Sequence, residues 1–145
     1  MIFFTREIYD KMQAHTFRET PAEREWLKRI KIYDQYRKLI SPLLPPAAAR
    51  LARAGLHDAT ILSARQTSRS LILVVETTNA LSRLSSRHPL KLSFKGVRRP
   101  VNTKRLQGAW WVCEEVHLSS HARFALHVLF QKHELEIEAD ELIIG

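Results

Sequence analysis

Four residues in the last third of the chain could do chemistry if the fold brought them together: Cys113, Glu115, His127 and Glu138. A histidine between a carboxylate and a thiol is the arrangement of an activated nucleophile with its orienting group. One thiol, one imidazole and two carboxylates can also bind a zinc ion. These residue types suggest a hydrolase or a metal-site enzyme, provided that the side chains share one face of one sheet.

The segment from residue 109 to residue 139 alternates between apolar and polar residues, and this period of two predicts β-strands with one buried face. We expect a three-strand antiparallel meander whose odd-numbered side chains in 111–117 and 123–131 point outward, as do the even-numbered ones in 134–138. Short turns would pair Cys113 with His127 and His127 with Glu138, with His117 nearby. Neither turn contains Gly or Asn to fix it, so a register shift of two residues is also open. The inward residues would form the core: Trp110, Val112, Phe124, Leu126, Val128, Phe130 and Ile137.

A solvated sheet face with ordinary cross-strand charge pairs is the alternative for this group, because polar outer faces are the rule in antiparallel sheets. Glu114 raises a separate question, since it belongs to the inward face between Val112 and Val116. A buried carboxylate needs a partner. It could be a general acid or base with a raised pKa, or it could form a structural salt bridge or hydrogen bond to a helix residue.

Basic residues are concentrated in the middle of the chain. The net charge is +5 over residues 1–55, +8 over residues 56–105 and −5 over residues 106–145. A basic cluster within 83–105 could follow a phosphate backbone. It could equally be neutralised by the acidic last third, which weakens the case for nucleic acid. The candidate anion-binding residues are Lys91, Lys95, Arg98, Arg99, Lys104 and Arg105.

Helix signals fill the first third. Thr5 can begin a helix over 6–15, and Thr20 with Glu23 forms a capping box for an amphipathic helix over 21–40. A short helix over 47–54 would end at Gly55. Strand signals follow at 59–62, 71–75 and 90–95. We predict an α+β fold, a single domain of 145 residues in which the helical part (1–55) packs on a mostly antiparallel β-sheet (56–145) ending in the meander.

Composition narrows the function classes. The chain has a single cysteine, which excludes an internal disulfide framework and a Cys-rich zinc site. It shows no signal peptide and no apolar run of roughly 18 residues, so we expect a cytoplasmic protein without a membrane segment. Gly-rich phosphate loops and nucleophile-elbow motifs are missing, so we expect no cofactor and assign no metal residues.

Four stretches carry a family resemblance: residues 3–13 (FFTREIYDKMQ), 56–62 (LHDATIL), 110–116 (WWVCEEV) and 134–142 (ELEIEADEL). The chain resembles an uncharacterised bacterial family known only as a domain of unknown function. The resemblance spans most of the chain and implies no catalytic residues.

These observations favour a non-catalytic binding or adaptor-type module that recognises another protein. The first alternative is a nucleic-acid-binding protein that uses region 83–105. The second is a hydrolase or metal-site enzyme that uses Cys113, His127 and Glu138. A homodimer formed through a sheet edge is also open.

Overall fold

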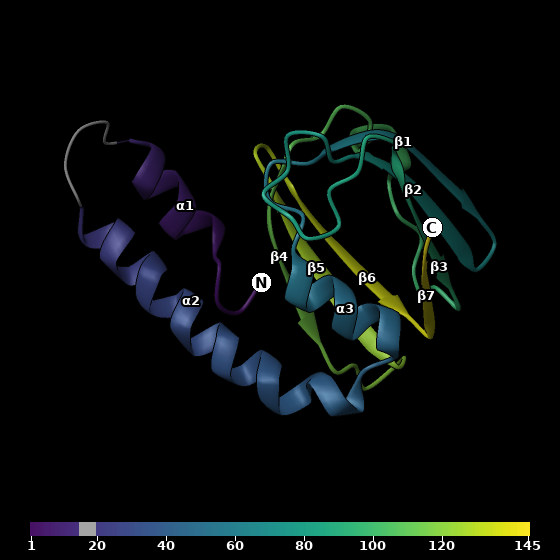
Figure 1. The fold of residues 1–145 in the computed structure, drawn as a ribbon, viewed down its shortest axis with the longest axis horizontal. Coiled ribbons are helices and arrows are strands. Elements are labelled where there is room, and N and C mark those ends of the chain that lie inside the picture. Colours follow the sequence, from purple (N-terminus) through teal and green to yellow (C-terminus); the bar gives the residue numbers. More distant parts are fainter. Residues whose placement is uncertain (15–19) are drawn as a thin grey trace.

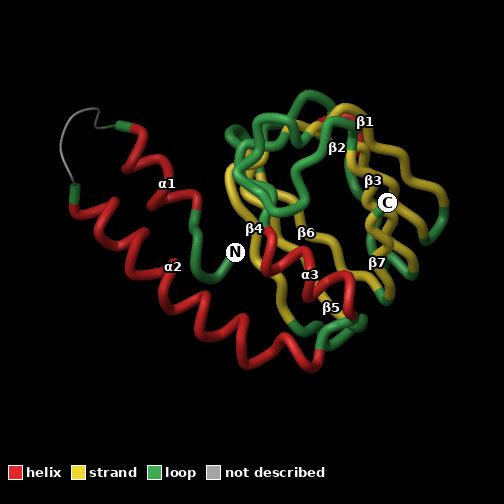
Figure 2. The backbone as a smooth tube through the Cα atoms, in the orientation of Figure 1, coloured by secondary structure: helices red, strands yellow, loops and turns green. Residues whose placement is uncertain are grey.

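The helical third forms an arm and a short bridge in the computed structural model, which describes residues 1–14 and 20–145. Helices α1 (Arg6–Gln13) and α2 (Pro21–Ile40) pack as a hairpin that extends away from the sheets (Figures 1 and 2). The capping box is present: the backbone N–H of Glu23 donates to the Thr20 hydroxyl at 3.2 Å, and that of Thr20 donates to the Glu23 carboxylate at 2.6 Å. The predicted end of the first helix, residue 15, lies outside the described residues.

Short elements connect the arm to the sheets. The 3-10 turn η1 (Ser41–Leu43) follows α2 directly, and α3 (Pro46–Ala54) ends at Gly55, whose φ of +66° is the left-handed geometry expected of a helix terminator. Helix α3 contacts β4 and β7, so it packs across the open side between the two sheets (Figure 1).

Seven antiparallel strands divide into two sheets instead of the single predicted sheet. The first sheet has the order β1-β2-β3-β7 and the second the order β4-β5-β6, which is the predicted meander. A bridge between Thr60 and Trp110 joins the sheets at one corner, and at the other only Asp140 separates β6 from β7. The bounds are β1 Thr60–Thr67, β2 Ser70–Glu76, β3 Leu90–Lys95, β4 Trp111–His117, β5 Phe124–Phe130, β6 Glu134–Ala139 and β7 Glu141–Ile144, with a 3-10 turn η2 at Thr103–Arg105.

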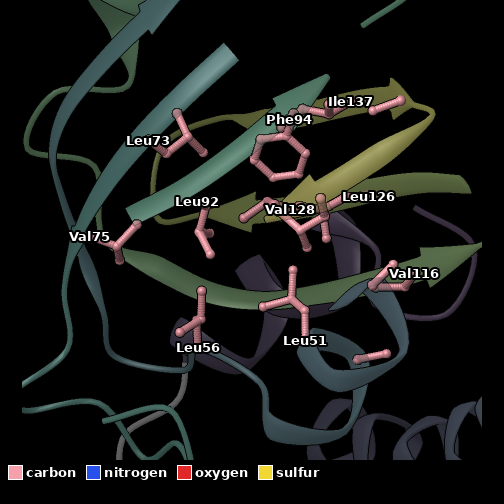
Figure 3. Packing of buried hydrophobic residues seen from close by; sticks show 14 of the residues in the cluster. Leu51, Leu56, Leu73, Val75, Leu92, Phe94, Val116, Leu126, Val128 and Ile137 are labelled. Atoms are coloured by element: carbon pink, nitrogen blue, oxygen red, sulfur yellow. The ribbon is translucent and has the colours of Figure 1, made fainter. Parts of the chain in front are cut away.

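The core lies between the two sheets, with α3 along one side. Leu73 and Leu92 from the first sheet face Leu126 and Val128 from the second, and Leu51 of α3 completes the packing (Figure 3). The predicted core residues Phe124, Leu126, Val128, Phe130 and Ile137 all belong to this cluster. None of the described helices is both long and apolar enough to cross a membrane.

The predicted alternation is wrong at the start of β4. Trp111 is fully buried in the core, whereas Trp110 is 45% exposed. A β-bulge between Trp111 and Cys113 inserts one extra residue, Val112, opposite Phe130. From Cys113 onward the predicted faces hold again, so the error is confined to the bulge.

Strand pairing is displaced by two residues from the predicted register. Cys113 pairs with Leu129 and His127 pairs with Glu115, while Glu138 pairs with Ala125. Turns without Gly or Asn leave such a shift open, because it preserves the face of every side chain. The shift decides which polar groups meet on the outer face of the second sheet.

Candidate functional site

The outer face of the second sheet is covered by the N-terminal segment. The Glu115 carboxylate accepts hydrogen bonds from the backbone N–H groups of Ile2, Phe3 and Phe4 at 2.7–2.9 Å. Glu115 has no solvent exposure. The prediction of a solvated face therefore does not hold for the part of the sheet that residues 2–4 cover.

Glu115, His117 and His127 form a compact polar cluster on this face. Nε2 of His117 lies 2.8 Å from Oε2 of Glu115, and Nδ1 of His117 lies 3.1 Å from the Tyr36 hydroxyl of α2. The rings of His117 and His127 have centroids 5.0 Å apart. Nε2 of His127 lies 3.5 Å from a carboxylate oxygen of Glu136. The shift in register brings these groups together, because it places His127 directly opposite Glu115.

Burial and hydrogen bonding oppose each other at Glu115. Burial acts to raise the pKa of Glu115, but the hydrogen bond from His117 and those from the backbone of residues 2–4 together lower it below its usual value. At His127, burial lowers the pKa and the Glu136 carboxylate counteracts that effect in part. The cluster thus combines an ionised carboxylate with an imidazole that resists protonation.

The structure separates Cys113 and Glu138 from His127. Cys113 lies opposite Leu129, and burial followed by the nearby Glu114 and Glu115 carboxylates strongly raises the pKa of its thiol. Glu138 accepts a hydrogen bond from the Ser119 hydroxyl at 2.8 Å and lies 3.8 Å from Arg99. The predicted adjacency of thiol, imidazole and carboxylate is wrong in this register.

Glu114 points toward α3 and is buried. Its carboxylate accepts hydrogen bonds from Nε1 of Trp111 at 2.6 Å and from the backbone N–H of Leu56 at 3.3 Å. Burial raises the pKa of Glu114, against the effect of these two donors. Glu114 forms no ion pair within residues 1–14 and 20–145. The hydrogen bonds fit the structural interpretation, in which Glu114 ties the end of α3 to β4.

A hollow of about 270 Å³ separates the helical arm from β4 beside Glu114. Trp26 and Ile30 of α2 form part of its wall, and His57 forms another part. Nδ1 of His57 contacts the carbonyl oxygen of Val112. At the other end of β4, the backbone N–H of Val116 donates to the Tyr33 hydroxyl at 2.7 Å. Side chains thus already contact backbone groups on the free edge of β4. An additional strand would need these same groups to hydrogen-bond to β4.

The basic cluster is partly neutralised by the acidic last third, as charge complementarity suggested. Arg98 lies 2.7 Å from Asp140, Lys95 lies 3.2 Å from Glu141, and Arg99 pairs with Glu138 as above. The other three candidate residues, Lys91, Lys104 and Arg105, are exposed and form no ion pair in the described part of the chain.

The outward face of α2 is basic and apolar. Leu27 and Leu39 are 53% and 77% exposed, and Ile32 is exposed as well. Helical spacing places the exposed basic residues between these apolar positions, on the side opposite the buried Tyr33. These basic residues are Arg24, Lys28, Lys31 and Lys38. Lys38 pairs with Asp34 at 2.6 Å, and the other three form no ion pair with any described residue.

Two contributors to the polar cluster differ from the sequence prediction. His117 lies within the cluster rather than beside it, and the Tyr36 hydroxyl of α2 is a partner that the sequence does not indicate. The alternation of Glu115 and His117 on one strand is a visible signal, because residues two apart share a face. The contribution of residues 2–4 has no local signal, since it depends on where the N-terminal segment docks.

Three comparisons with known proteins complete the description. Neither the curated proteins nor the solved structures contain a match to the chain. Among family models, the one described as "Protein of unknown function (DUF4085)" matches residues 19–138.

Proposed function

The chain belongs to the DUF4085 family, and we propose that this member is a non-catalytic module that binds an acidic protein partner through the outward face of α2. The observation that carries the proposal is the exposure of Leu27, Ile32 and Leu39 around basic side chains on one helix. Large apolar side chains clustered on an exposed surface are typical of interaction sites.

The shape of the arm supports this proposal. Helix α2 spans 20 residues, yet only Tyr33 and Ile40 are buried. Most helical stability in proteins comes from packing of an amphipathic face. A partner that covers the outward face would bury Leu39 and the neighbouring apolar side chains.

Charge indicates the chemistry of the partner. Arg24, Lys28 and Lys31 lie on the outward face without an acidic partner in the described residues. An apolar surface with an acidic rim is complementary to such a face, and complementary charge accelerates association and favours the correct partner.

The two alternatives receive less support. Nucleic-acid binding would rely on basic residues of which Lys95, Arg98 and Arg99 already have acidic neighbours. An enzyme using Cys113 would need the thiolate form of this residue, which burial disfavours. It would also need a base beside the thiol, but the residue that pairs with Cys113 on β5 is Leu129 instead of His127.

Site-specific cross-linking tests the proposal. A photo-reactive residue is introduced as Leu39→benzoylphenylalanine in cells that express the protein, with Ile143→benzoylphenylalanine as the control on an exposed position of the first sheet. We expect a discrete adduct with an acidic polypeptide from position 39 only, resistant to nuclease. The double substitution Lys28→Glu and Lys31→Glu should weaken it, whereas Lys91→Glu on β3 should not.

Other products would contradict the proposal. Adducts of equal yield from positions 39 and 143 would indicate unspecific contact. Adducts with lipid, with nucleic acid or only with a second copy of the chain would each assign the face to a different occupant.

A further inference from the structure

We propose that Glu115, His117 and His127 form a binding site for a zinc-class transition-metal dication, with an open coordination position toward solvent. The site lies on the outer face of the second sheet and is independent of the protein-binding face on α2.

Strand geometry alone brings the three ligands together. Glu115 and His117 are two apart on β4, so their side chains project from the same face. His127 on β5 pairs directly with Glu115. Directly opposed residues have Cβ atoms about 5 Å apart, which is within reach of one metal ion.

The distances fit a tetrahedral ion. One nitrogen of each histidine and one oxygen of Glu115 all lie within 4.8 Å of one another. Ligand atoms around a tetrahedral zinc ion lie about 3.4 Å apart, given bonds of about 2.1 Å. The 2.8 Å separation of His117 and Glu115 is shorter than this value, and the upper limit of 4.8 Å is longer. The separations in the cluster thus bracket the value that a tetrahedral ion requires.

Neighbouring groups already orient each ligand. The Tyr36 hydroxyl lies 3.1 Å from Nδ1 of His117, which leaves Nε2 on the side of Glu115. Glu136 lies beside His127, and the backbone N–H groups of residues 2–4 hold the Glu115 carboxylate. Metal-binding histidines and carboxylates commonly have such outer partners, which fix their orientation and raise affinity.

An entry path reaches the cluster from solvent. The side chain of His127 is 18% exposed, and it lines a hollow of about 180 Å³ together with Met1, Glu134 and Glu136. The two carboxylates outweigh the single positive charge of the Met1 amino group, so the opening attracts cations. Three protein ligands leave the fourth position of a tetrahedral ion free for water. Structural zinc sites differ in this respect, because protein side chains fill all four of their positions.

The ligand types select the class of ion. Two imidazoles with one carboxylate suit zinc and its neighbours in the first transition row, whereas Ca²⁺ and Mg²⁺ prefer sites made of oxygen ligands alone.

Metal titration of the full chain tests the proposal. Tag-free protein is treated with a chelator and titrated with Zn²⁺ by calorimetry and with Co²⁺ by absorption spectroscopy. We expect one ion per chain with a four-coordinate Co²⁺ spectrum. His127→Gln should weaken the affinity by about tenfold or more, because it removes a ligand. His121→Gln, at an exposed position near the same hairpin, should leave it unchanged.

A measurement on the unsubstituted chain guards against a variant that fails to fold. One equivalent of Zn²⁺ should shift the ring NMR signals of His117 and His127 and leave those of His57, His88, His121 and His133 in place. Unsaturable binding, equal affinity of His127→Gln, equal loss in His121→Gln, or shifts at the other histidines would each overturn the site.

Discussion

Nε1 of Trp111 donates a hydrogen bond to the Glu114 carboxylate at 2.6 Å, although the two residues are three positions apart on one strand. Regular alternation would place them on opposite faces. The bulge between Trp111 and Cys113 inserts Val112 and thereby turns both side chains toward the core. The same bulge that buries the indole thus supplies the buried carboxylate with its donor.

Trp111→Phe should therefore lower the free energy of unfolding by more than the loss of side-chain volume alone would. The substitution leaves a cavity and removes a donor from a buried carboxylate, so we expect the free energy of unfolding to fall by about 2–4 kcal/mol. Urea unfolding followed by circular dichroism measures this change. Trp110→Phe is the matched control and should cost less than about 0.5 kcal/mol, because Trp110 is 45% exposed. Equal losses in the two variants would contradict the assignment.

Elements with strong local signals were predictable from the sequence. The capping box of Thr20 and Glu23 predicts the start of α2, and strict alternation predicts a strand over residues 90–95. The structure confirms both. The meander is confirmed for the same reason, because its apolar and polar residues alternate over three consecutive strands. In each case the signal lies within the element itself.

Features that depend on long-range contacts were not predictable. Nothing in the residues around Trp110 and Trp111 indicates which of the two fills the core, because both are equally apolar. Turns without Gly or Asn allowed the shift that pairs His127 with Glu115. The last strand, β7, follows β6 along the chain but pairs with β3 in the first sheet. The residues of β7 themselves do not indicate this partner. The candidate site was therefore predicted on the correct face but with the wrong partners.

Arg6 fastens α1 to the hairpin between β5 and β6. Its guanidinium donates to the carbonyl oxygens of Gln131 at 2.8 Å and His133 at 2.9 Å, and also to that of Phe130. Arg6→Ala should lower the free energy of unfolding by about 1.5–3 kcal/mol, since these hydrogen bonds involve a charged donor. Amide hydrogen exchange of residues 2–4 should accelerate. These residues directly precede α1, so their hydrogen bonds to Glu115 depend on Arg6 holding the start of α1 in place.

Lys11 provides the control for Arg6. Its ion pair with Glu7 is exposed on both sides, so Lys11→Ala should change stability by less than about 0.5 kcal/mol and leave exchange at residues 2–4 unaltered. Faster exchange in the Lys11 variant would show that the stability of α1, rather than the hydrogen bonds of Arg6, determines how residues 2–4 bind Glu115.

His133 should make the protein less stable in mild acid. Its Nε2 is buried without a hydrogen-bond partner among the described residues. Burial, then the positive charges of Arg105 and Arg6, lower the pKa of His133 below its ordinary value of 6.5. The folded state thus favours the neutral ring, so its full contribution is present above pH 6.5 and is lost as the pH falls toward the folded pKa.

Comparison of the wild type with His133→Gln isolates this contribution. We expect the difference in free energy of unfolding between the two proteins to change in favour of the variant as the pH drops below 6.5. Denaturant unfolding at a series of pH values measures it. A difference that stays constant with pH would rule out His133 as the source.

Gly96 lies where the chain leaves β3 beside the corner between β6 and β7. Its φ is +68°, and a Cβ atom there would lie 2.8 Å from Cγ of Asp140. Gly108 has a similar φ of +75° but no atom within 4 Å of such a Cβ. Both Gly→Ala substitutions share the cost of a left-handed backbone, so their difference isolates the contact with Asp140.

Gly96→Ala should therefore destabilise the protein by about 1–3 kcal/mol more than Gly108→Ala, because the new methyl group displaces the Asp140 side chain. That displacement also breaks the ion pair of Asp140 with Arg98 at 2.7 Å. In an Asp140→Gly background both the carboxylate and the Cβ of residue 140, which would lie 2.9 Å from the new methyl carbon, are absent, so the penalty of Gly96→Ala should shrink toward that of Gly108→Ala. Urea unfolding of the four proteins in this cycle measures the coupling. An unchanged penalty would place the strain in the backbone of Gly96 instead of at the corner where the chain passes from one sheet to the other.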